Sequence, residues 1–210
     1  MKYFFLSIIL FTLFSCKKVQ EKVKVSDIVN ESNYKITYKK ENDTITQIHG
    51  ENKQYTLKGY KDIKNNVKVG WWEVEDKQNN YLYKIEYISL DKNKENQVKF
   101  YMNNKLINKY SQYYDIIYSN GIYQFKFYFQ EYNNEDIKIE FGYITSDGST
   151  PPLRKTIICK KENDYYTCFI PVKDKNQLIA GIVTEFATSN EVNEKILLSS
   201  KSMYVNTTSR

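Results

Sequence analysis

The chain has 210 residues, of which 31 are Lys or Arg and 25 are Asp or Glu, so its formal net charge is +6 at neutral pH. Hydrophobic residues make up 41% of the chain and aromatic residues 16%, which is enough for a folded core and argues against wholesale disorder. The basic residues alternate with acidic ones and include only two arginines, Arg154 and Arg210, so we expect no nucleic-acid partner. The single histidine, His49, argues against His-based metal sites and His-dependent nucleophiles, and we expect neither a metal nor another cofactor.

The N-terminus has the pattern of an export signal. Lys2 precedes an apolar run over residues 3–14, which is too short to span a bilayer comfortably. The run ends in Leu13-Phe14-Ser15-Cys16, and Lys17-Lys18 follow at once. This motif resembles the lipobox of bacterial lipoproteins, in particular the Bacteroidota type, in which an aromatic residue often stands at the position of Phe14. The alternatives are an ordinary secretory signal or an uncleaved anchor.

The resemblance implies cleavage by signal peptidase II before Cys16, which then carries diacylglycerol and an N-acyl chain such as palmitate. Several acyl chains anchor a protein stably, since each buried methylene adds about 0.8 kcal/mol. Residues 1–15 are then a signal peptide and residues 16–33 a polar lipidated tether, so we expect a membrane partner through the anchor. In lipoproteins of this type, surface-export signals favour acidic residues just after the lipidated cysteine. Here Lys17-Lys18 come before the first acidic residue, Glu21, so the resemblance implies an outer-membrane lipoprotein of the cell envelope that faces the periplasm.

Period-two alternation of apolar and polar residues dominates the rest of the chain and predicts an all-β fold. The expected strands lie at residues 34–38, 44–48, 55–60, 81–87, 98–102, 123–129, 137–143, 178–186, 196–198 and 203–205. Turn residues separate them, and Asn replaces Gly in most turns because it tolerates the left-handed backbone conformation. We expect an N-terminal antiparallel sheet domain over residues 34–115 and a small β-sandwich over residues 116–210.

Cys159 and Cys168 are the two cysteines that remain once Cys16 is lipidated. Strand-like segments flank both, and a two-residue turn at Asn163-Asp164 would place them directly opposite each other in a hairpin. In this register they form a non-hydrogen-bonded pair with Cα atoms about 4.5 Å apart, which lies within the disulfide range. The sequence therefore predicts a cross-strand disulfide, the alternative being two buried free thiols.

Residues 68–106 show a second resemblance. Lys68-Val69-Gly70-Trp71-Trp72, and then Tyr101-Met102-Asn103-Asn104-Lys105, resemble the MORN-like repeats of secreted β-sheet proteins. Those repeats pair a Gly-x-Trp strand with a Tyr-x-x-Asn-Gly-Lys turn, and here Asn104 stands in place of the second glycine. The resemblance implies an extended array of β-hairpins used for binding.

The aromatic residues are the candidate ligand-binding residues. Trp71 and Trp72 are adjacent on a strand and so face opposite ways. Either one enters the core and the other stays partly exposed, or they provide a platform for a glycan or peptide. A second group consists of tyrosines that suit either a binding surface or the half-wet face of a sheet. Its members are Tyr101, Tyr110, Tyr113, Tyr114, Tyr118, Tyr123, Tyr128 and Tyr132, of which we select Tyr101 and Tyr128.

The other motifs give weaker indications of a functional site. Asp43-Thr44-Ile45 resembles the O-glycosylation acceptor of exported Bacteroidota proteins and makes Thr44 a candidate site. Glu73 and Glu75 share a strand face, but without a cleft they do not indicate an acid/base pair. We therefore expect a non-enzymatic, lipid-anchored module that binds a protein or glycan. The alternative is an immunity-type inhibitor of an envelope-acting toxin, and an unrecognised hydrolase is a third, weaker hypothesis.

Overall fold

The computed structural model describes residues 24–89, 94–130, 136–146, 152–191 and 194–208. Cys16 and the motif that resembles a lipobox lie outside the described residues. Within them, helix is confined to a turn of α-helix, α2 (Val25–Ile28), and to the 3-10 turns η1 (Glu31–Asn33) and η2 (Asn108–Tyr110). None of the described helices is long and apolar enough to cross a membrane.

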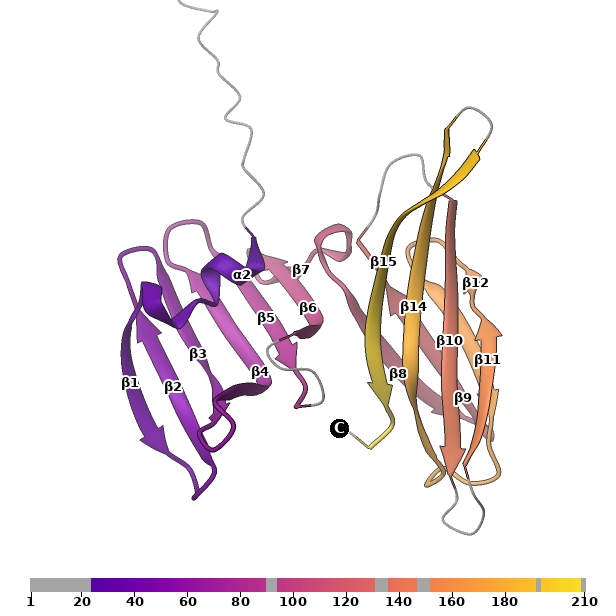
Figure 1. Cartoon of the computed structure of the whole chain (residues 1–210), viewed down its shortest axis with the longest axis horizontal. Helices are drawn as coiled ribbons and strands as arrows, with labels where there is room; N and C mark the ends of the chain where they lie inside the picture. The colour runs from indigo at the N-terminus through magenta and orange to yellow at the C-terminus, as the bar shows by residue number, and fades with distance from the viewer. Residues whose placement is uncertain (1–23, 90–93, 131–135, 147–151, 192–193, 209–210) are drawn as a thin grey trace, which may run out of the picture. The chain divides into compact units, whose positions relative to one another are not determined.

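Seven consecutive antiparallel strands form the first sheet, here called sheet A (Figure 1), in the order in which they follow one another along the chain. They are β1 (Lys35–Lys40), β2 (Ile45–Glu51), β3 (Tyr55–Asp62), β4 (Val67–Asp76), β5 (Tyr81–Tyr87), β6 (Glu95–Met102) and β7 (Lys105–Leu106). The buried face carries the apolar residues of the alternating pattern, for example Ile48, Leu57, Val74 and Ile85. Short polar turns allow only antiparallel neighbours, so this sheet is a meander.

Asparagine provides the backbone freedom that these turns need. All five described non-glycine residues with positive φ are asparagines, and they are Asn66, Asn80, Asn103, Asn104 and Asn120. Asn103 and Asn104 both have positive φ between paired residues Met102 and Lys105, which is the geometry of a tight type I′ hairpin. The prediction that Asn takes the place of Gly in turns is thus confirmed at Asn80, Asn103 and Asn104.

The second half of the described chain is a β-sandwich, so the predicted all-β class with an N-terminal sheet and a sandwich is confirmed. Sheet B has the order β12-β13-β9-β8, and sheet C the order β11-β10-β14-β15 (Figure 1). The strands are β8 (Tyr113–Ser119), β9 (Ile122–Tyr128), β10 (Asp136–Ser146), β11 (Leu153–Ile158), β12 (Lys160–Lys161), β13 (Tyr166–Pro171), β14 (Leu178–Glu191) and β15 (Glu194–Asn206). Both sheets contribute to one core, with Phe125, Phe127 and Ile170 from sheet B and Phe141 and Val183 from sheet C.

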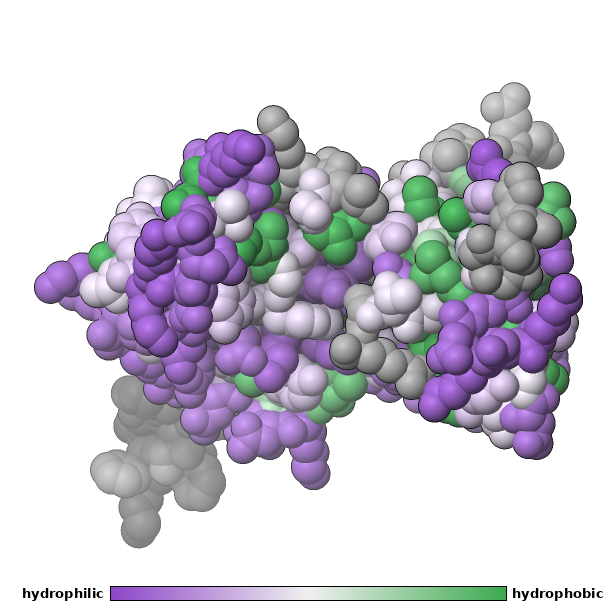
Figure 2. All heavy atoms as spheres, turned by 90° about the horizontal axis from the view of Figure 1, so that it is seen from below, coloured by the Kyte–Doolittle hydropathy of each residue, from purple (hydrophilic) through white to green (hydrophobic). Residues whose placement is uncertain are grey.

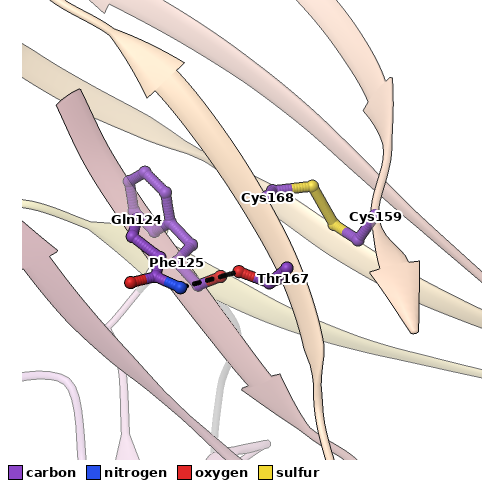
Figure 3. Close-up of a disulfide and its surroundings, with 5 residues drawn as sticks. All are labelled: Gln124, Phe125, Cys159, Thr167 and Cys168. Atoms are coloured by element: carbon purple, nitrogen blue, oxygen red, sulfur yellow. Dashed lines mark hydrogen bonds between the residues drawn. A yellow bond between two sulfur atoms is a disulfide. The ribbon is translucent and has the colours of Figure 1, made fainter. Parts of the chain in front are cut away.

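The disulfide lies where the chain passes from one sheet of the sandwich to the other (Figure 3). β11 pairs with β10 in sheet C, and β12 pairs with β13 in sheet B, with Cys159 between them. Cys159 is bonded to Cys168, with Cα atoms 4.8 Å apart, in the predicted register that places Lys160 opposite Thr167. Both cysteines are buried in the sandwich core, so the bond fastens the crossover to β13.

Two boundaries differ from the sequence-based expectation. Sheet A ends at Leu106, and Tyr113 already belongs to sheet B, so the sheets divide before the expected boundary at residue 115. The segment 16–33 was expected to be a polar tether. Its described part contains α2, and Ile28 and Val29 are buried. A single helical turn has too few apolar positions to produce a periodic pattern, which is why the sequence did not reveal it.

A polar clamp joins sheet A to both sheets of the sandwich. β6 is irregular beside Glu86, and the buried side chains of Asn96 and Gln97 both donate to the Glu86 Oε2 atom, at 2.7 Å each. The Asn96 amide also exchanges two hydrogen bonds with the backbone of Tyr204 in β15, at 2.6 and 3.0 Å. Gln97 Oε1 accepts from the Tyr114 backbone N–H in β8 at 3.2 Å. The Glu86 carboxylate thus orients both amides, of which Asn96 binds sheet C and Gln97 binds sheet B.

Candidate functional site

The two adjacent tryptophans of β4 lie on opposite faces of sheet A, and only Trp72 is buried. Trp72 has no exposed surface, and its indole N–H donates to the Tyr60 carbonyl at 3.0 Å. The ring lies on Gly59, where an added Cβ would come within 2.2 Å of it. The prediction that Trp72 binds a ligand is therefore wrong, because a fully buried ring that closes the core of sheet A presents nothing to solvent.

Trp71 points to the outer face of sheet A and is 37% exposed. Its cross-strand partner on β5 is Glu86. The Lys99 ammonium, from β6, lies 5.7 Å from the centre of the Trp71 ring and 4.8 Å from that of Tyr113. Lys99 therefore stands between an aromatic ring of sheet A and one of sheet B, in a cation–π geometry with both.

The aromatic contacts continue across sheet B. Tyr113 on β8 is opposite Tyr128 on β9, and their rings stack at 4.3 Å with an interplanar angle of 6°. The Tyr128 ring lies 5.5 Å from that of Tyr165, which immediately precedes β13. The Lys126 ammonium lies 5.1 Å from the Tyr165 ring. We call Trp71, Lys99, Tyr113, Tyr128, Tyr165 and Lys126 the aromatic–lysine row.

Tyr101 lies at the margin of this row. It is two residues from Lys99 on β6, so both side chains leave the same face of sheet A. Three of the four selected aromatic residues, Trp71, Tyr101 and Tyr128, are thus brought to one surface. The remaining tyrosines scatter: Tyr123 is in the sandwich core, Tyr110 packs on Phe100, and Tyr132 lies outside the described residues.

Tyr113 is the most buried ring of the row. Burial raises the pKa of its phenol well above the ordinary value, and the neighbouring Tyr128 and Asp115 raise it further. The hydroxyl donates a hydrogen bond to Asn108 Oδ1 at 3.0 Å. The phenol therefore stays neutral at physiological pH, and the Tyr113 ring stacks on the half-buried ring of Tyr128.

Sequence reasoning did not select Lys99, Lys126 or Tyr165, and it listed Tyr113 only as one tyrosine among eight. Tyr165 follows directly on the Asn163-Asp164 turn, so the sequence predicts its position at the end of a hairpin. Its position beside Tyr128 depends on the pairing of β13 with β9, two strands far apart in the chain. No local pattern specifies that pairing, since it is set by the shared core.

The carboxylates beside Trp71 are already engaged. Glu73 forms an ion pair with Lys84 at 2.6 Å, and Glu86 accepts the two amides of the clamp. Glu73 and Glu75 do share a face of β4, but Glu73 is committed to its lysine. Glu75, on the same face of β4, and Asp115, opposite Lys126 on β8, are exposed.

The row is a platform rather than a pocket. The surface face drawn in Figure 2 is mostly hydrophilic, with apolar residues gathered in small groups. A cavity of about 280 Å³ lies elsewhere, between Asn96 of β6 and the Ile182, Ser202 and Tyr204 side chains of sheet C. No cluster of three or more metal-ligating side chains occurs among the described residues.

The other candidate residues are placed as follows. Thr44 is exposed in the turn between β1 and β2, where its hydroxyl lies 3.1 Å from Asn42 Oδ1, so the acceptor position is accessible. His49 is exposed on β2. Glycosylation of Thr44 and lipidation of Cys16 stay predictions.

The chain was also compared with known proteins. No family model matches it, and no curated protein or solved structure matches it significantly.

Proposed function

We propose that the protein is a non-enzymatic, lipid-anchored binding module of the bacterial cell envelope, which holds a protein or glycan ligand on the aromatic–lysine row. The observation that carries the proposal is the row itself: Trp71, Tyr128 and Tyr165 present rings on one connected surface, with two lysines between or beside them. Aromatic rings give large contact area at low conformational cost, which is why they dominate binding surfaces.

The lipobox supports the anchoring part of the proposal. A lipid on Cys16 would attach the protein to the outer membrane, and Lys17-Lys18 next to it favour the periplasmic leaflet. The membrane is then a partner through the anchor alone, and the ligand is held by the folded sheets.

The test uses the full chain purified in detergent and a printed array of neutral and acidic oligosaccharides and unmodified peptides. Trp71→Ala and Tyr128→Ala are each expected to weaken the strongest array signals about tenfold or more, because a central aromatic residue contributes about 2 kcal/mol at a binding surface. Tyr38→Ala is the control, since Tyr38 is 66% exposed on edge strand β1, outside the row.

Trp72→Ala is unsuitable as a binding variant, because emptying a buried aromatic site costs about 3–5 kcal/mol of folding stability. The proposal is contradicted if neither Trp71→Ala nor Tyr128→Ala changes array binding. Both variants must unfold at the same urea concentration as the wild type for this result to count. Protection against a co-expressed envelope-acting toxin that is equally indifferent to both substitutions would instead support the inhibitor alternative.

A further inference from the structure

Two lysines meet beside Trp71, on a face that also carries the carboxylates of Glu73 and Glu86. Lys84 and Lys99 are direct cross-strand partners on the outer face of sheet A. Like charges opposite each other in a sheet are unfavourable. Only Lys84 has a carboxylate partner, Glu73, and within the described part of the chain Lys99 forms no ion pair but lies over two rings.

Lys126 repeats this arrangement at the other end of the row. Its ammonium lies over Tyr165, and none of the described carboxylates forms an ion pair with it, although Asp115 is its exposed cross-strand neighbour on β8. The row therefore holds two ammonium groups over aromatic rings, and neither forms an ion pair with a described carboxylate.

The backbone beside the row is closed to an added strand. The N–H groups of Val98 and Gln112 each donate to the other residue's carbonyl at 2.7 Å, and the Tyr114 N–H is taken by Gln97. An extended peptide binds a sheet by adding to free edge groups, and at this point they are occupied. Besides the exposed carboxylate of Asp115, the surface offers flat rings and two ammonium groups, which suit sugar rings that carry acid groups.

We propose that the aromatic–lysine row binds an acidic glycan, with sugar rings stacked on Trp71, Tyr128 and Tyr165 and acid groups paired with Lys99 and Lys126. This inference rests on the proposed function and narrows it to one class of ligand. The aromatic rings supply affinity for the sugar, and the two lysines select chains that carry negative charge.

The experiment is isothermal titration of the full chain in detergent with three acidic probes: hexagalacturonate, a sulfated heparin hexasaccharide and a sialylated hexasaccharide. Maltohexaose is the neutral glycan control, and hexaglutamate is the acidic peptide control. At least one acidic glycan is expected to bind about tenfold more tightly than both controls, and this preference should shrink in concentrated NaCl, because salt screens exposed charges.

Lys99→Gln and Lys126→Gln are each expected to weaken binding of that acidic glycan by roughly fivefold or more while leaving maltohexaose binding unchanged. Lys53→Gln, in the exposed turn before β3, removes the same charge outside the row and should change neither. Equal binding of acidic and neutral glycans, with no effect of Lys99→Gln, overturns the inference. If Trp71→Ala still abolishes binding in that case, the proposed function stands.

Hexaglutamate binding as tight as that of the best acidic glycan also overturns the inference, since the row would then select charge without sugar. Failure of all three acidic probes to bind overturns it as well. The proposed function fails separately, when the array signals do not depend on Trp71 or Tyr128.

Discussion

Asp76 ends β4 as a buried carboxylate held by its own turn. Its oxygens accept from the backbone N–H groups of Gln78 and Asn79 and from the side-chain amides of Asn79 and Gln54, at 2.9–3.1 Å. Burial by itself would raise the pKa of Asp76, but these hydrogen bonds outweigh burial and hold the pKa below its ordinary value. The charged form is therefore the stable one in the folded protein.

The stability that Asp76 contributes should depend on pH. Because its pKa is lower in the folded chain, the contribution is complete above the unfolded pKa of about 3.9 and is lost as the pH falls through the folded pKa. We expect Asp76→Asn to lower the free energy of unfolding by about 1.5–3 kcal/mol at pH 7, the value of hydrogen bonds to a charged group. Urea denaturation at pH 7 and pH 2.5 measures this difference, which should narrow at the lower pH.

Asp62 offers a matched control, because it accepts from Lys64 and Asn65 in the same way in the turn before β4, but at a more exposed place. Asp62→Asn should have the smaller effect at pH 7. An effect of Asp76→Asn that is the same at both pH values would show that shape rather than charge is what the position requires.

Alternation predicted that Trp71 and Trp72 lie on opposite faces, but not which of them is buried. That choice depends on Gly59, whose missing side chain leaves space for the Trp72 ring. Gly59 is on β3, where the pairing with β4 shifts register between Lys58 and Tyr60. A register shift between two strands leaves no trace in the periodicity of either, so the sequence alone left both readings open.

At the scale of elements, the hairpin around the disulfide was the most predictable part of the fold. The turn at Asn163-Asp164 fixes the register of both arms, and the register alone places Cys159 opposite Cys168. The sequence did not show that Cys159 is also the point where the chain changes sheets. The passage from β11 to β12 depends on which strands each arm meets, and those partners, β10 and β13, are specified by the core.

Reduction of this disulfide should destabilise the sandwich without emptying its core. The sequence separation of the two cysteines is 9 residues, and closing a loop of this size stabilises a fold by about 2–3 kcal/mol in the chain-entropy model. Urea denaturation with and without reductant is expected to show a lower midpoint in the reduced protein. The reduced thiols keep the buried packing, so an unchanged midpoint would mean that the cross-link contributes little beyond that packing.

At the scale of the whole molecule, the lipobox-like motif at residues 13–16 predicts where the protein resides. Cys16→Ala should move the protein from the membrane fraction to the soluble fraction and abolish incorporation of labelled palmitate, because acyl chains supply the membrane affinity. Lys18→Gln keeps the cysteine and should stay in the membrane fraction. Retention of Cys16→Ala in the membrane fraction would contradict lipid anchoring and favour an uncleaved signal anchor.

The class of the fold was predictable throughout, since period-two alternation and asparagine turns recur in both halves of the chain. The proposed binding surface was predictable only in part. Trp71, Tyr101 and Tyr128 stand out by residue type, but Lys99 and Lys126 look like any other lysine on a polar strand face. Their proposed role depends on the rings they lie over, which come from other strands and partly from another sheet.

Glu86 gives the clamp and the row a common residue. It is the cross-strand neighbour of Trp71, and the same carboxylate orients Asn96 and Gln97, which hold sheets C and B. A ligand that spans Trp71 and Tyr165 therefore bridges separately built sheets across the seam that the clamp closes. Such a ligand would raise the free energy of unfolding by about 2.7 kcal/mol at a free concentration one hundred times its Kd. The ligand-bound protein would then resist separation of its sheets at this seam, and the ligand-free protein would open there first.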